Sequence, residues 1–153
     1  MALFLVRHGR SLPEEIDSQR RLSRAGITEV ECVAAHVQDR GIRVDTIIHS
    51  PAARARQTAE IMASYLKPGH DAMEVAGLGP SNSVEAFAGS INENDDIMVV
   101  GHLPFLERLC SYLVTGSPDE RVVSFRSGTM VCLEKDPARG AWVIRWTLRP
   151  DIC

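Results

Sequence analysis

Two histidines and an arginine stand where they could bind and transfer a phosphoryl group. Arg7 and His8 follow the apolar run Leu3–Val6, and His102 follows a second apolar run in the same way. An arginine guanidinium presents a planar fork of donors that suits phosphate oxygens. A neutral imidazole can act as a nucleophile. Arg7 and His8 alone could equally be a surface pair that closes the strand. Two histidines placed in the same way are harder to assign to packing, and they favour a phosphoryl-transfer site.

Arg54 supports this hypothesis through its place in a predicted helix. Ser50 and Pro51 are typical of an N-cap and a first helical residue, so a helix is expected from there to about Leu66. Arg54 then falls in the first turn, where a cation opposes the helix dipole at a cost of about a few tenths of a kcal/mol unless an anion is bound. Arg54 therefore points to an anion.

The elements that must position these residues alternate between strands and helices. A helix is expected between the N-cap Ser23 and the stop signal Gly41. Strands are expected at 3–6, 44–49, 72–75 and 96–101, with further helices at 84–90 and 104–115. Such alternation predicts an α/β fold, a three-layer α/β/α sandwich with a mostly parallel central sheet. Ligands bind at the carboxyl ends of strands in such sheets.

The last third of the chain reads as an antiparallel edge of that sheet. Apolar and polar residues alternate over 122–125, 129–134 and 141–148. Trp142 and Trp146, four residues apart on the last of these strands, are expected on one face as core residues.

Composition limits the classes of protein that fit. The 153 residues suit one domain over 1–153, and a net charge of −3 argues against nucleic-acid binding. No apolar stretch is long enough for a membrane span. The N-terminus enters a strand without the features of a signal peptide, so a cytoplasmic location is expected.

The four cysteines predict packing rather than chemistry. None forms a C-x-x-C pair, so neither a zinc ribbon nor a redox motif is indicated. Cys32, Cys110 and Cys132 fall in apolar patterns and are expected to be buried free thiols, and the terminal Cys153 is expected to have no role.

Several phosphate chemistries are excluded by motif. The chain has no GxxxxGK[ST] loop, and no cysteine is followed six residues later by arginine, as a cysteine-dependent phosphatase loop requires. His8 and His102 lack a third ligand at a recognisable spacing, so no metal and no other cofactor is expected.

Three segments resemble the histidine phosphatase superfamily, the phosphoglycerate-mutase-like group. They are LVRHGRS at 5–11, SPAARARQTAE at 50–60 and VVGHLPF at 99–105. The small size and GHLP are similar to its short phosphohistidine phosphatase branch, the SixA type. Arg20-Arg21-Leu22-Ser23, with Gly26 following, resembles the RPLT-x-x-G segment of that branch, with Arg21 where proline is usual.

The resemblance implies a role for each matching position. His8 would be the nucleophile that takes the phosphoryl group, and Arg7, Arg54 and His102 would hold its oxygens. We expect His8 to be neutral with one ring nitrogen bonded to a backbone carbonyl, and His102 to be protonated when phosphate is bound. The further oxygen contacts expected are Gly9, Ser11, Arg20 and Leu103.

The sequence departs from the family pattern at the proton donor. Larger members that act on alkyl phosphates carry a carboxylate in the loop after the SPxxRAxQT helix, whereas 77–83 here is GLGPSNS. Only Glu74 and Glu85 flank it. A general acid is worth about 10²–10⁴ in rate, and an imidazole leaving from phosphohistidine needs less of this help.

The expected substrate is therefore phosphohistidine on a protein, either a phosphorelay domain or a phosphotransferase carrier, with inorganic phosphate as the product. A general small-molecule phosphomonoesterase and a phosphate-recognition module without turnover are the alternatives.

Overall fold

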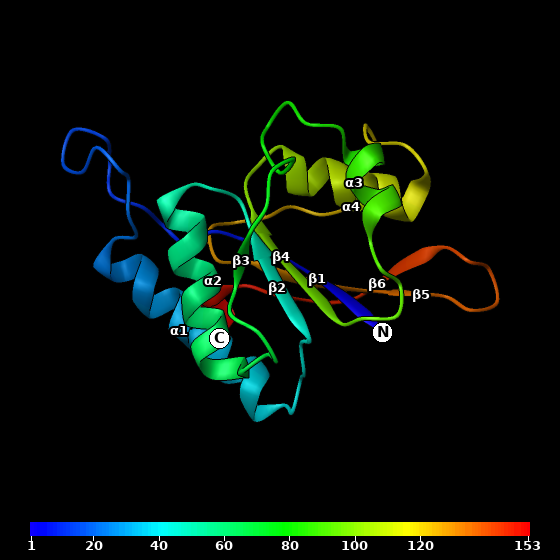
Figure 1. Cartoon of the computed structure of the whole chain (residues 1–153), viewed down its shortest axis with the longest axis horizontal. Coiled ribbons are helices and arrows are strands. Elements are labelled where there is room, and N and C mark those ends of the chain that lie inside the picture. Colours follow the sequence, from blue (N-terminus) through cyan, green and yellow to red (C-terminus); the bar gives the residue numbers. More distant parts are fainter.

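Helices cover both faces of a six-stranded sheet in a computed structural model that describes all residues, 1–153 (Figure 1). The strands are β1 (Ala2–Arg7), β2 (Thr46–His49), β3 (Met73–Glu74), β4 (Ile97–Gly101), β5 (Met130–Lys135) and β6 (Trp142–Leu148). The helices are α1 (Arg24–Asp39), α2 (Ala53–Leu66), α3 (Val84–Ser90) and α4 (Phe105–Thr115), followed by the short 3-10 helix η1 (Pro150–Ile152).

The sheet has the order β3-β2-β4-β1-β5-β6. Its first four strands are parallel, and β5 and β6 pair antiparallel with β1 and with each other. Helices α1 and α2 pack on one face and α3 and α4 on the other. The predicted three-layer α/β/α sandwich with an antiparallel C-terminal edge is confirmed. None of the helices is long and apolar enough to cross a bilayer.

Strand β1 is buried on both faces, which explains its unbroken apolar run. Phe4 and Val6 belong to the core under α1 and α2, whereas Leu3 and Leu5 belong to the core under α3 and α4. Alternate side chains of a strand point to opposite faces, so a central strand needs apolar residues at every position. This double packing fixes the carboxyl end of β1, where Arg7 lies.

Helix α1 begins where the sequence predicts it. Ser23 is the N-cap, and its hydroxyl accepts a hydrogen bond of 3.0 Å from Gly26 N. Gly26 lies against the chain that leaves β1: a Cβ placed on it would come 2.1 Å from Arg10 O. Only glycine allows this crossing, which holds α1 close to the carboxyl end of β1.

The predicted start of α2 is wrong by two residues. The helix begins at Ala53, and its N-cap Ala52 makes no side-chain capping bond. The Ser50 hydroxyl instead forms a hydrogen bond with His102 Nε2. A serine hydroxyl just before a helix can cap that helix or form a hydrogen bond with a residue at the end of a neighbouring strand. Its position in the sequence does not show which of the two it does.

The strand predicted at 122–125 is also absent, because its backbone bonds to side chains rather than to a neighbouring strand. Phe125 N donates to Glu107 Oε1 at 3.2 Å, and Phe125 O accepts from Arg7 Nη1 at 2.9 Å. The segment holds a site residue instead of extending the sheet.

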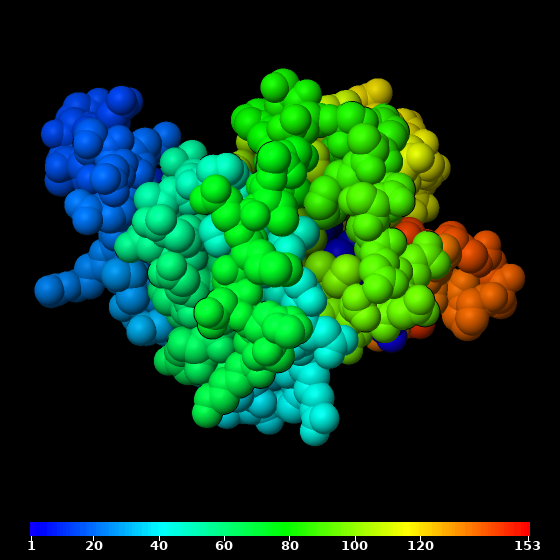
Figure 2. All heavy atoms as spheres, in the orientation of Figure 1, coloured from blue at the N-terminus to red at the C-terminus, as the bar shows by residue number.

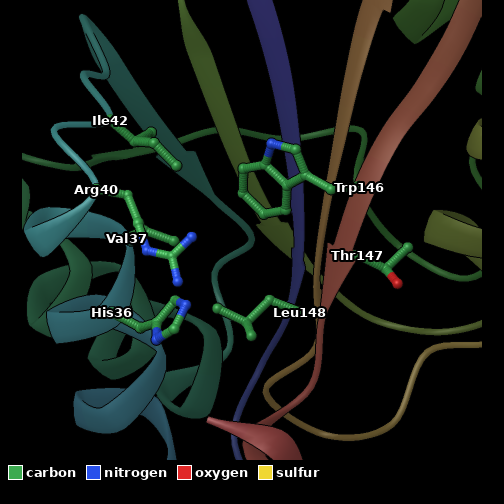
Figure 3. A pocket seen from close by; sticks show the side chains of 7 residues that line it. All are labelled: His36, Val37, Arg40, Ile42, Trp146, Thr147 and Leu148. Atoms are coloured by element: carbon green, nitrogen blue, oxygen red, sulfur yellow. The ribbon is translucent and has the colours of Figure 1, made fainter.

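The two tryptophans of β6 lie on opposite faces of the sheet, contrary to the prediction of a shared face. The register between β5 and β6 shifts between Cys132 and Leu133, as at a β-bulge, and this reverses the strict alternation. Trp142 therefore packs in the α4 core and Trp146 against the α1 core. Trp146 lines a hollow between α1 and β6 together with His36, Val37, Arg40, Ile42, Thr147 and Leu148 (Figure 3).

A disulfide joins Cys32 of α1 to Cys153, so the packing role predicted for Cys32 and the absence of a role predicted for Cys153 are both wrong. Helix η1 packs on α1 and brings the two Cα atoms to 6.1 Å across 121 residues of sequence. Cys110 and Cys132 are buried free thiols, as predicted. Burial raises the pKa of both to about 12.

Candidate active site

The ends of three neighbouring elements bring the four predicted site residues into one pocket of about 640 Å³. Arg7 ends β1 opposite Gly101 of β4, which places His8 and His102 side by side, with ring centres 5.0 Å apart. Arg54 enters from the first turn of α2. The predicted contacts Arg20 and Leu103 also line the pocket.

His8 is held as a neutral imidazole. Its Nδ1–H donates to Gly9 O at 2.8 Å, as predicted, which leaves the Nε2 lone pair free. Burial is the main cause that lowers the pKa of His8 to about 4, and His102, Arg54 and Arg7 act in the same direction. The imidazole is therefore uncharged at neutral pH and can attack an electrophile.

His102 also has a pKa lowered to about 4, first by burial and then by Arg54, Arg7 and Arg20. In the free pocket it is neutral. A bound phosphoryl group would counter these positive charges and favour the protonated ring. The hydrogen bond between its Nε2 and Ser50 Oγ fixes the ring against the end of β2.

A backbone carbonyl holds the Arg7 side chain in place. Its Nη1 donates to Phe125 O at 2.9 Å, while its buried Nε has no partner within the protein. A buried donor without a partner costs free energy that a ligand oxygen could recover. The guanidinium is thus held in place by one hydrogen bond, while its Nε–H has no partner in the protein.

The pocket gathers positive charge without a neutralising carboxylate. Arg7, Arg20 and Arg54 line it and form no ion pair, and none of the fifteen lining residues is acidic. Burial and the nearby Arg20 lower the pKa of Arg54. Arginines brought this close are stabilised by an anion, so the geometry is that of a site for a small oxyanion.

Comparisons with known proteins match this chain in sequence and in overall fold. The sequence profile of the histidine phosphatase superfamily (branch 1) matches residues 3–76. The solved structure of the protein histidine phosphatase SixA complexed with tungstate superposes with a TM-score of 0.86, covering 99% of each chain at 25% identity. The chain belongs to the histidine phosphatase superfamily.

Similarity in sequence to two proteins covers most of the length of this histidine phosphatase. Phosphohistidine phosphatase SixA of Escherichia coli is 25% identical, with 98% of this chain and 94% of that protein covered. An uncharacterized protein of Picosynechococcus is 29% identical, with 84% of this chain and 86% of that protein covered.

Two further predicted contacts of the histidine phosphatase site do not line its pocket. The N–H of Gly9 donates to Thr58 Oγ1 at 3.0 Å, and Ser11 pairs with Leu22 in an isolated β-bridge. Their backbone groups are used to hold the loop after β1. We therefore leave Gly9 and Ser11 out of the proposed phosphate contacts.

The motif residue Thr58 has a positioning role that the sequence did not reveal. It is fully buried, accepts from Gly9 N and donates to Arg54 O at 2.8 Å. It thus ties the loop after His8 to the turn of α2 that carries Arg54. Ser50 and Phe125 were missed in the same way. Ser50 opens the motif at 50–60, which could have indicated it, whereas Phe125 lies in none of the motifs and no signal in the sequence points to it.

The loop 76–82 forms part of the pocket wall and contributes no acidic side chain. Gly77, Leu78, Gly79, Pro80 and Asn82 line the pocket, whereas Glu74 and Glu85 do not. Glu85 instead accepts from Ser83 Oγ at 3.0 Å. No group of three or more His, Cys, Asp or Glu side chains is placed to hold a metal ion.

Proposed function

We propose that this phosphatase hydrolyses phosphohistidine on a protein, through a covalent phospho-His8 intermediate. One observation carries the proposal: the pocket holds two neutral histidines and three unpaired arginines, and no carboxylate. The SixA proteins that this chain resembles are a phosphohistidine phosphatase and a protein histidine phosphatase, which supports the same substrate class.

In the first step, His8 Nε2 attacks the phosphorus of the substrate phosphohistidine. The bond from phosphorus to the substrate nitrogen breaks, and its electron pair stays on the leaving imidazole. Arg7, Arg54 and His102 hold the three equatorial oxygens, on which negative charge is spread in the transition state. The hydrogen bond from His8 Nδ1–H to Gly9 O stabilises the charge that develops on the His8 ring.

In the second step, water attacks the phosphorus of phospho-His8. The phosphorus–nitrogen bond breaks and its electron pair returns to His8 Nε2, which restores the neutral ring. The oxygen of the water and its protons leave as part of inorganic phosphate. The same positive groups serve this step, since its transition state has the same charge distribution.

The lack of an acid in the pocket favours phosphohistidine over an alkyl phosphate. An alkoxide leaves poorly unless a general acid protonates it, and that help is worth about 10²–10⁴ in rate. The imidazole of phosphohistidine can leave as a neutral group because its other nitrogen already carries a proton. The acid-free wall formed by 76–82 is therefore suited to this substrate.

The first prediction concerns the intermediate and the substrate. With EDTA present, we expect kcat/KM on a phosphorelay domain carrying phosphohistidine to exceed that on p-nitrophenyl phosphate. Rapid quenching with labelled substrate is expected to trap an acid-labile, base-stable phosphoenzyme, the stability pattern of a phosphoramidate. His8→Ala is expected to abolish the phosphoenzyme and lower kcat by about 10³-fold or more, because the nucleophile is lost.

His70→Ala is the matched control, since His70 is exposed and outside the pocket, and it is expected to keep full activity. A higher kcat/KM on p-nitrophenyl phosphate would favour the general phosphomonoesterase. Phosphate binding without turnover or phosphoenzyme would favour a recognition module. Full activity of His8→Ala would reject the mechanism.

A further inference from the structure

The loop 12–21 stands out from the body of the molecule and exposes a large apolar side chain at its tip. It forms the dark blue projection in Figure 1 and in the space-filling view of Figure 2. Ile16 is 73% exposed, more than the other exposed large hydrophobic residues, of which Ile152 follows at 62%. The Ile16 side chain therefore contributes almost no burial energy to the fold and is free to contact a partner.

This loop is braced from within. Asp17 is buried and accepts hydrogen bonds from Gln19 N, Arg21 N and Arg21 Nε at 3.2, 3.0 and 2.9 Å. Leu12 N donates to Arg21 O at 2.8 Å and closes the base of the loop. The loop therefore presents Ile16 in a preformed geometry, and little ordering entropy remains to be lost when a partner binds.

The same loop forms part of the pocket. Arg20 lines the pocket beside Arg54 and has a φ of +49°, a left-handed conformation that side chains rarely adopt. Its N–H donates to Asp17 O at 2.9 Å, so the buried aspartate braces both the tip and the pocket residue. A molecule whose phosphoryl group reaches Arg20 would meet the rest of this loop alongside.

The charges around the tip indicate what kind of surface it fits. Glu14 and Glu15 are exposed beside Ile16 and form no ion pair, whereas Arg21 is paired with Asp17. The tip is therefore an apolar spot with an acidic border. Its complement is an apolar patch bordered by lysine or arginine.

We propose that the loop 12–21 is the docking element for the protein that carries the phosphohistidine, with Ile16 packed on an apolar patch bordered by basic residues. The inference rests on the proposed function and adds where the partner is recognised. Small phosphoryl compounds do not reach the tip, so the loop separates protein substrates from small ones.

The experiment compares two substrates, a phosphorelay domain phosphorylated on its histidine with phosphoramidate, and free phosphohistidine. For Ile16→Ser we expect KM on the domain to rise about tenfold, the order expected for one lost aliphatic anchor, with kcat unchanged. Activity on free phosphohistidine is expected to stay within about twofold, because the pocket is untouched. Glu14→Lys with Glu15→Lys is expected to raise KM on the domain more at low salt than at high salt.

Ile152→Ser removes the same type of side chain, also largely exposed, from the C-terminal helix η1 and is the matched control. It is expected to leave both substrates unaffected. An unchanged KM on the domain for Ile16→Ser, an equal rise for Ile152→Ser, or an equal loss on both substrates would overturn the docking role. If the unaltered protein hydrolyses p-nitrophenyl phosphate but neither phosphohistidine substrate, the proposed function fails, and the docking role fails with it.

Discussion

His8 shows how a single residue acquires its chemistry from its surroundings. The sequence predicts a neutral ring fixed by a backbone carbonyl, and the bond from Nδ1 to Gly9 O confirms it. Arg54 and Arg7 also disfavour the protonated form of His8 by their positive charge. Burial, however, is the larger cause of the low pKa of both His8 and His102. How deeply the end of a strand is covered depends on the loops packed around it.

The low pKa of His8 has a consequence for stability. Between pH 6.5 and about pH 4 the ring takes up a proton in the unfolded chain but not in the folded one. The unfolded state binds more protons in this window, so the free energy of unfolding is highest above pH 6.5 and falls as the pH drops toward 4. We expect His8→Gln to show a smaller fall than the unaltered protein in urea unfolding at a series of pH values.

His70→Gln replaces an exposed histidine and is expected to keep the pH dependence of the unaltered protein. Equal pH dependence in His8→Gln and the unaltered protein would contradict the assignment of this proton uptake to His8.

At the scale of elements, the site depends on how closely α1 approaches the end of β1. Ser23 N donates to Arg10 O at 2.9 Å, and the Ser23 hydroxyl caps α1 through Gly26. Gly26 has no room for a side chain because Arg10 O occupies the place of its Cβ. The loop from His8 to Arg10 is thereby clamped between α1 and Thr58 of α2.

A pair of helical glycines tests this contact. We expect Gly26→Ala to lower the free energy of unfolding by about 1–3 kcal/mol, since the added methyl group forces backbone apart. Gly89→Ala in α3 meets nothing within 4 Å and is expected to leave stability unchanged or raise it by up to about 1 kcal/mol, through helix propensity. Urea unfolding of the two variants measures both effects, and equal stabilities would contradict the close approach.

At the scale of the whole molecule, the disulfide joins Cys153 to helix α1, which packs beside the loop that carries His8. Cys153 is bonded to Cys32, and η1 before it places Pro150 against Gly128. The N–H of Gly128 donates to the carbonyls of both Arg7 and His8 at 3.1 Å. The C-terminus thus braces the loop beneath the pocket. Disulfides persist in oxidising surroundings and are rare in the cytosol. The bond therefore argues against the cytoplasmic location that the sequence predicts.

Counting thiols tests the disulfide directly. Without reductant, we expect two reactive thiols in denaturant, Cys110 and Cys132, and four after reduction. Cys153→Ser is expected to lower the free energy of unfolding by about 2–4 kcal/mol, because an open chain gains more entropy on unfolding. Reduction of the unaltered protein is expected to lower its stability to that of the variant. Four reactive thiols without reductant would contradict the bond.

The sequence by itself determined the alternation of helices and strands, the mostly parallel sheet with its antiparallel edge, and the four residues that meet in the pocket. The apolar run Leu3–Val6 predicts a buried strand. Arg7, His8, Arg54 and His102 follow strand ends or begin a helix, and parallel topology collects these positions at one edge of the sheet. These features depend on local pattern and on the rules that connect parallel strands.

Only the tertiary structure decided which partners each group finds. The Ser50 hydroxyl binds His102 rather than capping α2, Phe125 O holds Arg7 rather than pairing in a sheet, and Cys153 reaches Cys32. The bulge in β5 and β6 reverses the face of one tryptophan. Each contact joins segments far apart in the chain, and a hydroxyl, carbonyl or thiol can satisfy several partners. The packing of the elements selects among them.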